Sequence, residues 1–81
     1  MSLKESEQLI SEAVELLPPQ RKKVYQLSRI EGLTHAQIAQ QLNISTSTVN
    51  NQLTEALHFI KKYLQETADA YIVLLILLAQ H

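Results

Sequence analysis

The stretch that decides the fold is residues 33–57, LTHAQIAQQLNISTSTVNNQLTEAL. Thr34 suits a helix N-cap, and Gln37 follows it at the spacing of a capping box. Asn43 tolerates a left-handed backbone and so predicts a sharp turn after a short helix. Ser45 is a second N-cap residue. These signals predict two capped helices joined by a turn of about three or four residues, a helix-turn-helix that occupies residues 34–64.

Apolar residues at steps of three and four fix the two helices against each other. The shorter helix has Ile38, Ala39 and Leu42 on one face, and Ala39 is small enough for close approach of its partner. The longer helix carries an inward stripe of Val49, Leu53, Ala56, Leu57, Ile60 and Leu64. Leu33 and Ile44 precede the two caps, at hydrophobic-staple positions. From packing alone, an ordinary helical hairpin that binds nothing is the alternative.

Two further helices are expected before this unit. Residues 2–17 form an amphipathic pattern that opens with Ser2 and Glu5 at capping-box spacing. Pro18 and Pro19 end that helix and can open the next one, which runs to about residue 30. Its inward residues are expected to be Val24, Leu27 and Ile30. Gly32 is the expected left-handed cap.

The C-terminal residues 67–81 predict a hydrophobic helix. Residues 71–78 are all apolar, so every side of a helix there is hydrophobic. We expect this segment to pack on the domain or to mediate association, with a homo-oligomer through residues 70–79 as one form. The apolar run is about half of the ~20 residues that a membrane span needs, so no membrane is expected. The predicted fold class is all-α, a small bundle of four to five helices of the winged-helix-like DNA-binding class without a sheet, with residues 1–66 as the helix-turn-helix domain.

Charge is unevenly distributed along the chain. Seven Lys and Arg against eight Asp and Glu give a net charge of −1, so the chain as a whole does not attract nucleic acid. Residues 18–32 are nevertheless basic, with Arg21, Lys22, Lys23 and Arg29 against Glu31. This permits a local phosphate-binding face. The absence of Cys and of a targeting signal fits a cytoplasmic protein.

The outward side of the longer helix carries unusual residues for an exposed helix. Its members are Thr46, Ser47, Asn50, Asn51, Thr54, Glu55 and His58. Exposed helices commonly use Glu, Lys and Ala, which favour helix more than adjacent Asn residues do. Asn can pair bidentately with adenine in the major groove, and Ser or Thr can bind phosphate near a helix N-terminus. These residues favour a helix less than Glu, Lys or Ala would, but they can form hydrogen bonds with bases and phosphates. This pattern indicates a recognition helix.

Catalysis and cofactor binding find no support in the sequence. His35, His58 and His81 are too widely spaced for a local metal site, and no Cys or carboxylate joins them at ligand spacing. No nucleophile and base, paired acids or Gly-rich phosphate loop suggests a reaction. We expect no enzyme activity, no cofactor and no metal.

The ordered set of short motifs resembles a known family. These motifs are Leu17-Pro18-Pro19, Glu31-Gly32-Leu33-Thr34, Gln37-Ile38-Ala39, Ile44-Ser45 and Thr48-Val49, followed by Leu53 and Ala56. Over about residues 12–64 they resemble region 4 of bacterial sigma factors, within the extracytoplasmic-function group of the sigma-70 family. The resemblance implies a domain that recognises the promoter −35 element and docks on the RNA polymerase β flap to direct transcription initiation.

The resemblance also assigns residues and partners. The implied base contacts are Asn50, Asn51, Gln52, Thr54 and Glu55. The implied phosphate contacts are Lys22, Lys23, Thr34, Thr46, Ser47 and Thr48. An anti-sigma factor is a further implied partner, and the chain is expected to be part of a longer sigma factor because region 2 is missing. The family often has Lys or Arg in place of Asn50, Gln52 and Glu55, so a different base preference and modest stand-alone affinity are expected.

Two alternatives remain at this stage. A helix-turn-helix output domain of a response regulator has the same architecture, although the Pro18-Pro19 and Glu31-Gly32-Leu33 segments favour the sigma factor. A helical dimerisation module held by residues 70–79, without DNA binding, is the second. Binding to duplex DNA measured against salt separates these classes.

Overall fold

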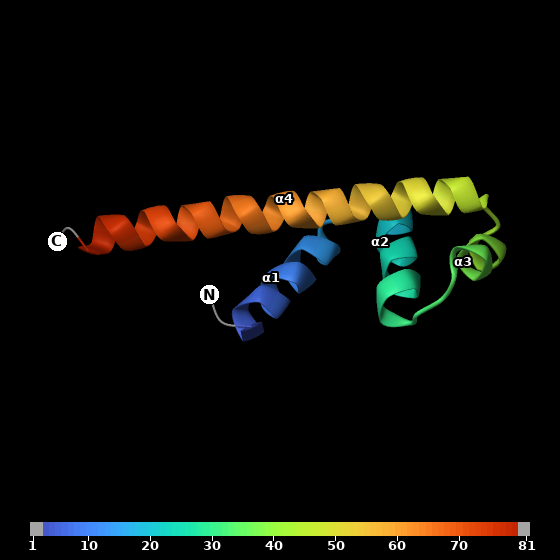
Figure 1. The fold of residues 1–81 in the computed structure, drawn as a ribbon, viewed down its shortest axis with the longest axis horizontal. Coiled ribbons are helices and arrows are strands. Elements are labelled where there is room, and N and C mark those ends of the chain that lie inside the picture. Colours follow the sequence, from blue (N-terminus) through green and yellow to red (C-terminus); the bar gives the residue numbers. More distant parts are fainter. Residues whose placement is uncertain (1–2, 80–81) are drawn as a thin grey trace.

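The fold is a long helical rod with three short helices packed along part of it. The computed structural model describes residues 3–79. Their elements are α1 (Leu3–Glu15), α2 (Pro19–Tyr25), the π-helical turn η1 (Gln26–Ile30), α3 (His35–Leu42) and α4 (Thr46–Ala79). In Figure 1, α4 runs the length of the molecule and the other helices approach it at steep angles, with α2 nearly perpendicular to it. The molecule measures 57 × 19 × 15 Å. Within the described residues only helices and connecting segments occur, which confirms the all-α prediction.

Two clusters of buried side chains hold the short helices to α4. The first, here the α3 cluster, joins α2, η1, α3 and the start of α4. It consists of Val24, Leu27, Ile38, Ala39, Val49 and Leu53. The second, the α1 cluster, consists of Ala13, Val14, Leu17, Ala56 and Ile60. Since α4 contributes to both, burial of apolar surface along one helix fixes the positions of all the others.

The segment before α3 differs from the sequence prediction at Ile30. We expected Ile30 to point inward, but its side chain is 72% exposed, so that prediction is wrong. The backbone N–H of Glu31 donates to the carbonyl of Gln26 at 3.1 Å, five residues back, and this wider winding turns Ile30 out of line with Val24 and Leu27. Gly32 then takes φ +71°, which confirms the left-handed cap.

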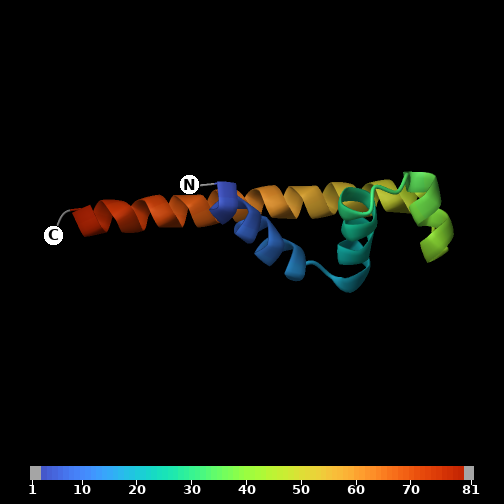
Figure 2. The same ribbon diagram turned by 90° about the horizontal axis from the view of Figure 1, so that it is seen from below.

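The C-terminal part of α4 corrects a second prediction. The expected helix is present over residues 67–79, but it is not set apart from the domain, because α4 continues through residues 66–67 to Ala79 without a break. No Gly or Pro lies beyond residue 45 to interrupt it. Seen from below in Figure 2, this end of α4 extends past the other helices. Residues 72–78 are accordingly exposed, instead of packing on the domain.

A third correction concerns Leu57. It was expected to point inward, but it is 37% exposed because α4 presents Ala56 to the core and Leu57 lies a further 100° round the helix. The expected Ser2 cap and His81 lie outside the described residues. Over residues 3–79, no helix combines the length and the hydrophobicity needed to cross a membrane.

Candidate nucleic-acid interface

The start of α3 is fixed by a complete capping box. The backbone N–H of Gln37 donates to Thr34 Oγ1 at 3.1 Å, and the backbone N–H of Thr34 donates to Gln37 Oε1 at 2.8 Å. Two N–H groups that the helix leaves without partners are thereby satisfied. The capping box at Thr34 is therefore confirmed. The hydroxyl of Thr34 already accepts a hydrogen bond from within the protein.

The turn between α3 and α4 depends on Asn43. Its backbone lies in the left-handed region at φ 57° and ψ 47°. The next residue, Ile44, donates its N–H to the carbonyl of Ala39 at 3.0 Å, which closes the end of α3. Ser45 then caps α4, because its Oγ accepts the N–H of Thr48 at 3.0 Å. The hydroxyls of Ser45 and Thr48 also lie 2.8 Å apart, so Thr48 is part of the cap.

The exposed side of α4 carries most of the residues expected to contact bases. Asn50, Asn51, Thr54 and Glu55 are all exposed, while Val49 and Leu53 of the same helix are buried in the α3 cluster. The buried residues fix the rotation of α4, so these four side chains project from one rigid surface. Their amide, hydroxyl and carboxylate groups offer both hydrogen-bond donors and acceptors without a cluster of positive charge.

Gln52 lies apart from the other four. Its side chain is partly buried, and its Oε1 accepts a hydrogen bond from Arg21 Nε at 3.2 Å. Its Nε2 donates to Gln20 Oε1 at 3.4 Å. Gln52 thus connects α4 to the first turn of α2. Sequence reasoning missed Arg21 as a partner of the recognition helix, and no local signal joins two positions 31 residues apart.

The residues expected to contact phosphate are found in four settings. Thr46 and Ser47 are exposed at the N-terminus of α4, where backbone N–H groups point outward. Lys23 is exposed on α2. Lys22 is paired instead with Glu15 of α1, with Nζ 2.7 Å from Oε2. Thr34 and Thr48 act in caps, so Lys23, Thr46 and Ser47 have the most accessible polar groups of this set.

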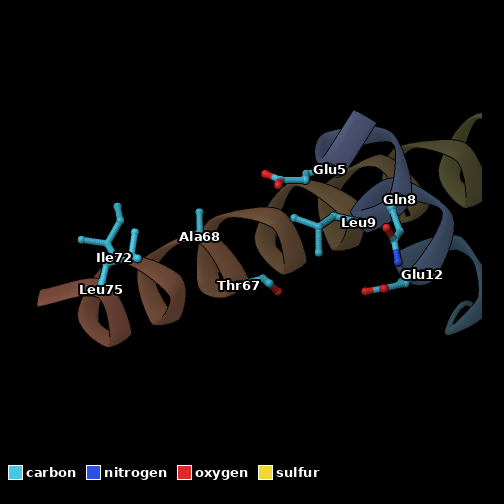
Figure 3. Close-up of a pocket in the computed structure, with 8 residues that line it drawn as sticks. All are labelled: Glu5, Gln8, Leu9, Glu12, Thr67, Ala68, Ile72 and Leu75. Atoms are coloured by element: carbon cyan, nitrogen blue, oxygen red, sulfur yellow. The ribbon is translucent and has the colours of Figure 1, made fainter. Parts of the chain in front are cut away.

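A separate pocket lies between α1 and the C-terminal half of α4. It encloses about 440 Å³ and has an apolar floor that includes Leu9, Ile72 and Leu75. Figure 3 shows Leu9 on α1 directed toward α4, with Glu5 and Glu12 along the α1 side. The segments that line this pocket, α1 and the C-terminal half of α4, lie away from the turn between α3 and α4, which is at the other end of α4 in Figure 1.

One titratable group near this pocket is perturbed. Tyr63 of α4 donates its hydroxyl proton to Glu12 Oε2 at 3.2 Å. Partial burial of the phenol, followed by that hydrogen bond and the negative charge of Glu12, raises the pKa of Tyr63 above its ordinary value. Among residues 3–79, no group of three His, Asp or Glu side chains is placed to hold a metal ion.

Comparison with known proteins identifies a family for most of this fold. The family model described as Sigma-70, region 4 matches residues 7–60, which is more than half of the chain. The match covers both buried clusters and the turn between α3 and α4, and it ends before the exposed C-terminal part of α4. No curated protein matches the chain.

Proposed function

Because the chain belongs to the sigma-70 region 4 family, we propose that the first turns of α4 enter the major groove of the promoter −35 element and read its bases. Membership makes the chain a DNA-binding regulatory domain of transcription initiation and not an enzyme. It also favours the sigma factor over the response-regulator alternative. We further propose which residues of this chain contact bases and which contact phosphates.

One observation carries the assignment of base contacts. Asn50, Asn51, Thr54 and Glu55 are exposed on a helix whose opposite side is locked into the α3 cluster. Asn is suited to adenine and Glu to the amino group of cytosine in the major groove. Gln52 supports this surface from behind, because it is hydrogen-bonded to α2. We assign Gln52 a positioning role, in place of the base contact that the resemblance implied.

Among the residues expected to contact phosphate, some are proposed to make the contact and others to position the helices. Thr46 and Ser47 present hydroxyls and backbone N–H groups at the start of α4, and Lys23 adds a cation from α2. Lys22 contributes positive charge from beside Glu15, which offsets part of it. Thr34 and Thr48 act by fixing the helix starts. These contacts set the position of the domain on the duplex without reading sequence.

Selection from randomised duplexes tests this function. The chain is mixed with a pool of duplexes that carry a randomised central segment, and bound duplexes are recovered and sequenced. We expect enrichment of one short motif. The variant Asn51→Ala should lose preference at one position of that motif, whereas Leu16→Ala, at an exposed residue just after α1 and outside the proposed contact surface, should recover the wild-type motif. A wild-type pool without any enriched motif would contradict base recognition by this surface.

Docking on RNA polymerase is assigned to the other end of the molecule. We propose that the β flap packs into the pocket between α1 and α4. The apolar floor and the distance from the recognition surface support simultaneous binding of DNA and polymerase. Leu9→Glu should abolish capture of an isolated flap domain, while Leu16→Glu, 61% exposed and not lining the pocket, should leave capture unchanged. Equal capture by both variants would place the flap elsewhere.

An anti-sigma factor stays a predicted partner, supported by the family resemblance alone. Control by such a protein would act on the same two surfaces, since occupation of either one prevents productive binding to promoter or polymerase.

A further inference from the structure

The C-terminal part of α4 exposes more apolar surface than an isolated domain normally does. Seven consecutive side chains, residues 72–78, are each 52–62% exposed. A contiguous run of exposed large apolar side chains of this kind marks an interaction site on a protein surface. This segment lies beyond residue 60, where the family match ends. The family match therefore assigns no role to this segment.

The pocket defines which side of this segment faces α1. Ile72 and Leu75 line the pocket with Leu9. At 100° per residue, the side of α4 directed away from α1 is then formed by residues 70, 73, 74 and 77. These are Ala70, Val73, Leu74 and Leu77, all exposed and spaced three, four and seven positions apart. We call this set the outer stripe. It is the spacing of a helix face that packs against another helix.

The composition of the outer stripe makes it complementary to itself. In an antiparallel pair with a two-fold axis between positions 73 and 74, Ala70 faces Leu77 of the second copy and Val73 faces Leu74. Small residues therefore meet large ones at both ends of the contact, as close helix packing requires. In a parallel pair Ala70 meets Ala70 and leaves a gap, while Leu77 meets Leu77.

Charge selects the same arrangement. The segment from residue 70 to residue 79 contains no charged residue, and Glu66 and Asp69 lie directly before it. A parallel pair brings these acidic residues of both copies together, which is unfavourable. An antiparallel pair places them at opposite ends and also aligns the helix dipoles favourably.

We propose that two copies of this chain associate through their outer stripes in an antiparallel arrangement. The two recognition surfaces then lie at the far ends of the dimer, and the pockets that face α1 remain on the opposite side of each α4. The proposal is independent of DNA binding, because it uses none of the residues assigned to bases, phosphates or the polymerase flap.

A matched pair of substitutions tests the interface. Leu77 and Leu75 are the same residue type on the same helix, 56% and 54% exposed, but only Leu77 belongs to the outer stripe. Sedimentation equilibrium of the full chain should show a reversible monomer–dimer equilibrium. Leu77→Gln should weaken it at least about 10-fold, because the substitution removes a buried leucine from each copy, while Leu75→Gln should change it less than about 3-fold. A monomeric wild type at all concentrations, or equal loss in both variants, overturns the proposal.

Cysteine pairing tests the antiparallel direction, since the chain contains no Cys. An equimolar mixture of Ala70→Cys and Leu77→Cys should form a mixed disulfide dimer on mild oxidation. Each variant alone should not, because the two copies of either position are seven residues, about 10 Å, apart along the helix axis, beyond disulfide reach. A disulfide dimer of Ala70→Cys alone would show a parallel pair, and an assembly larger than a dimer would exclude a two-copy interface.

Discussion

The Nε of Arg21 donates a hydrogen bond to Oε1 of Gln52 at 3.2 Å, and this contact joins α2 to the recognition helix across 31 positions of sequence. Gln20 contacts the same side chain from the preceding position. A glutamine expected to read bases is thus hydrogen-bonded to α2, beside the surface that is proposed to read bases. Because these hydrogen bonds join α2 to α4, we expect substitutions on α2 to affect DNA recognition without removing a base contact.

This coupling predicts different effects for neighbouring residues. Asn51→Ala should cost about 1–3 kcal/mol of DNA-binding free energy on the preferred sequence and relax selectivity at one base position. Gln52→Ala should weaken binding to all sequences alike, because it removes support from α2 and not a base contact. Titrations against duplexes that differ at single positions of the selected motif provide the measurement. Selectivity lost at one position in Gln52→Ala would identify Gln52 as a base contact after all.

Binding should depend strongly on salt even though the chain is slightly acidic overall. With few accessible cations, about three to five phosphates are neutralised, which gives a slope of log K against log salt of about −3 to −5. Lys23→Ala should make this slope smaller in magnitude by about one and weaken all sequences alike. Lys61→Ala, on the part of α4 beyond the recognition surface, serves as the charge-matched control and should leave the slope unchanged. An affinity that does not vary between low and moderate salt would remove the electrostatic basis of the interface.

Stability of the helix-turn-helix should rest on its buried stripe more than on its caps. Leu53 is 6% exposed within the α3 cluster, so Leu53→Ala should lower the free energy of unfolding by about 2–5 kcal/mol. Thr34→Ala removes one capping hydrogen bond and should cost nearer ~1 kcal/mol. Urea unfolding followed by circular dichroism measures both. Small and equal losses would mean that Leu53 adds little to the core.

The Tyr63–Glu12 hydrogen bond predicts a loss of stability at alkaline pH. Because the folded state raises the pKa of Tyr63, the protonated phenol contributes stability that is complete below its ordinary pKa of about 10. That contribution is lost as pH rises through the raised pKa. Relative to Tyr63→Phe, the wild type should therefore lose stability above about pH 10 and keep a constant difference below it.

Glu12→Gln refines this measurement, since it removes the negative charge beside the phenol and keeps a hydrogen-bond acceptor. In the Glu12→Gln background, the loss of stability above about pH 10 relative to Tyr63→Phe should be smaller. Parallel stability curves for wild type and Tyr63→Phe across the alkaline range would show that the contact between α1 and α4 does not depend on the phenol proton.

Local sequence was enough to predict the features whose energies are local. The capping box at Thr34, the left-handed turn at Asn43 and the Ser45 cap all depend on atoms within a few residues of one another, and the structure confirms each. The apolar stripe through Val49, Leu53 and Ile60 was readable for a similar reason, because helical periodicity alone places these residues on one face. The exposure of Ile30 could not be predicted in this way, because a π-helical hydrogen bond changes the helical periodicity there.

By itself, the sequence determined that this protein is all-helical, where its helices start and turn, and which family of DNA-binding domains it belongs to. Only the tertiary structure decided that Gln52 faces α2, that Lys22 is paired with Glu15, and that α4 continues past the domain with its apolar residues exposed. The physical reason is the range of the interactions involved. Caps and turns are formed between near neighbours along the chain, whereas these features depend on which helix surfaces meet when α1, α2 and α3 bury their apolar sides against one long helix.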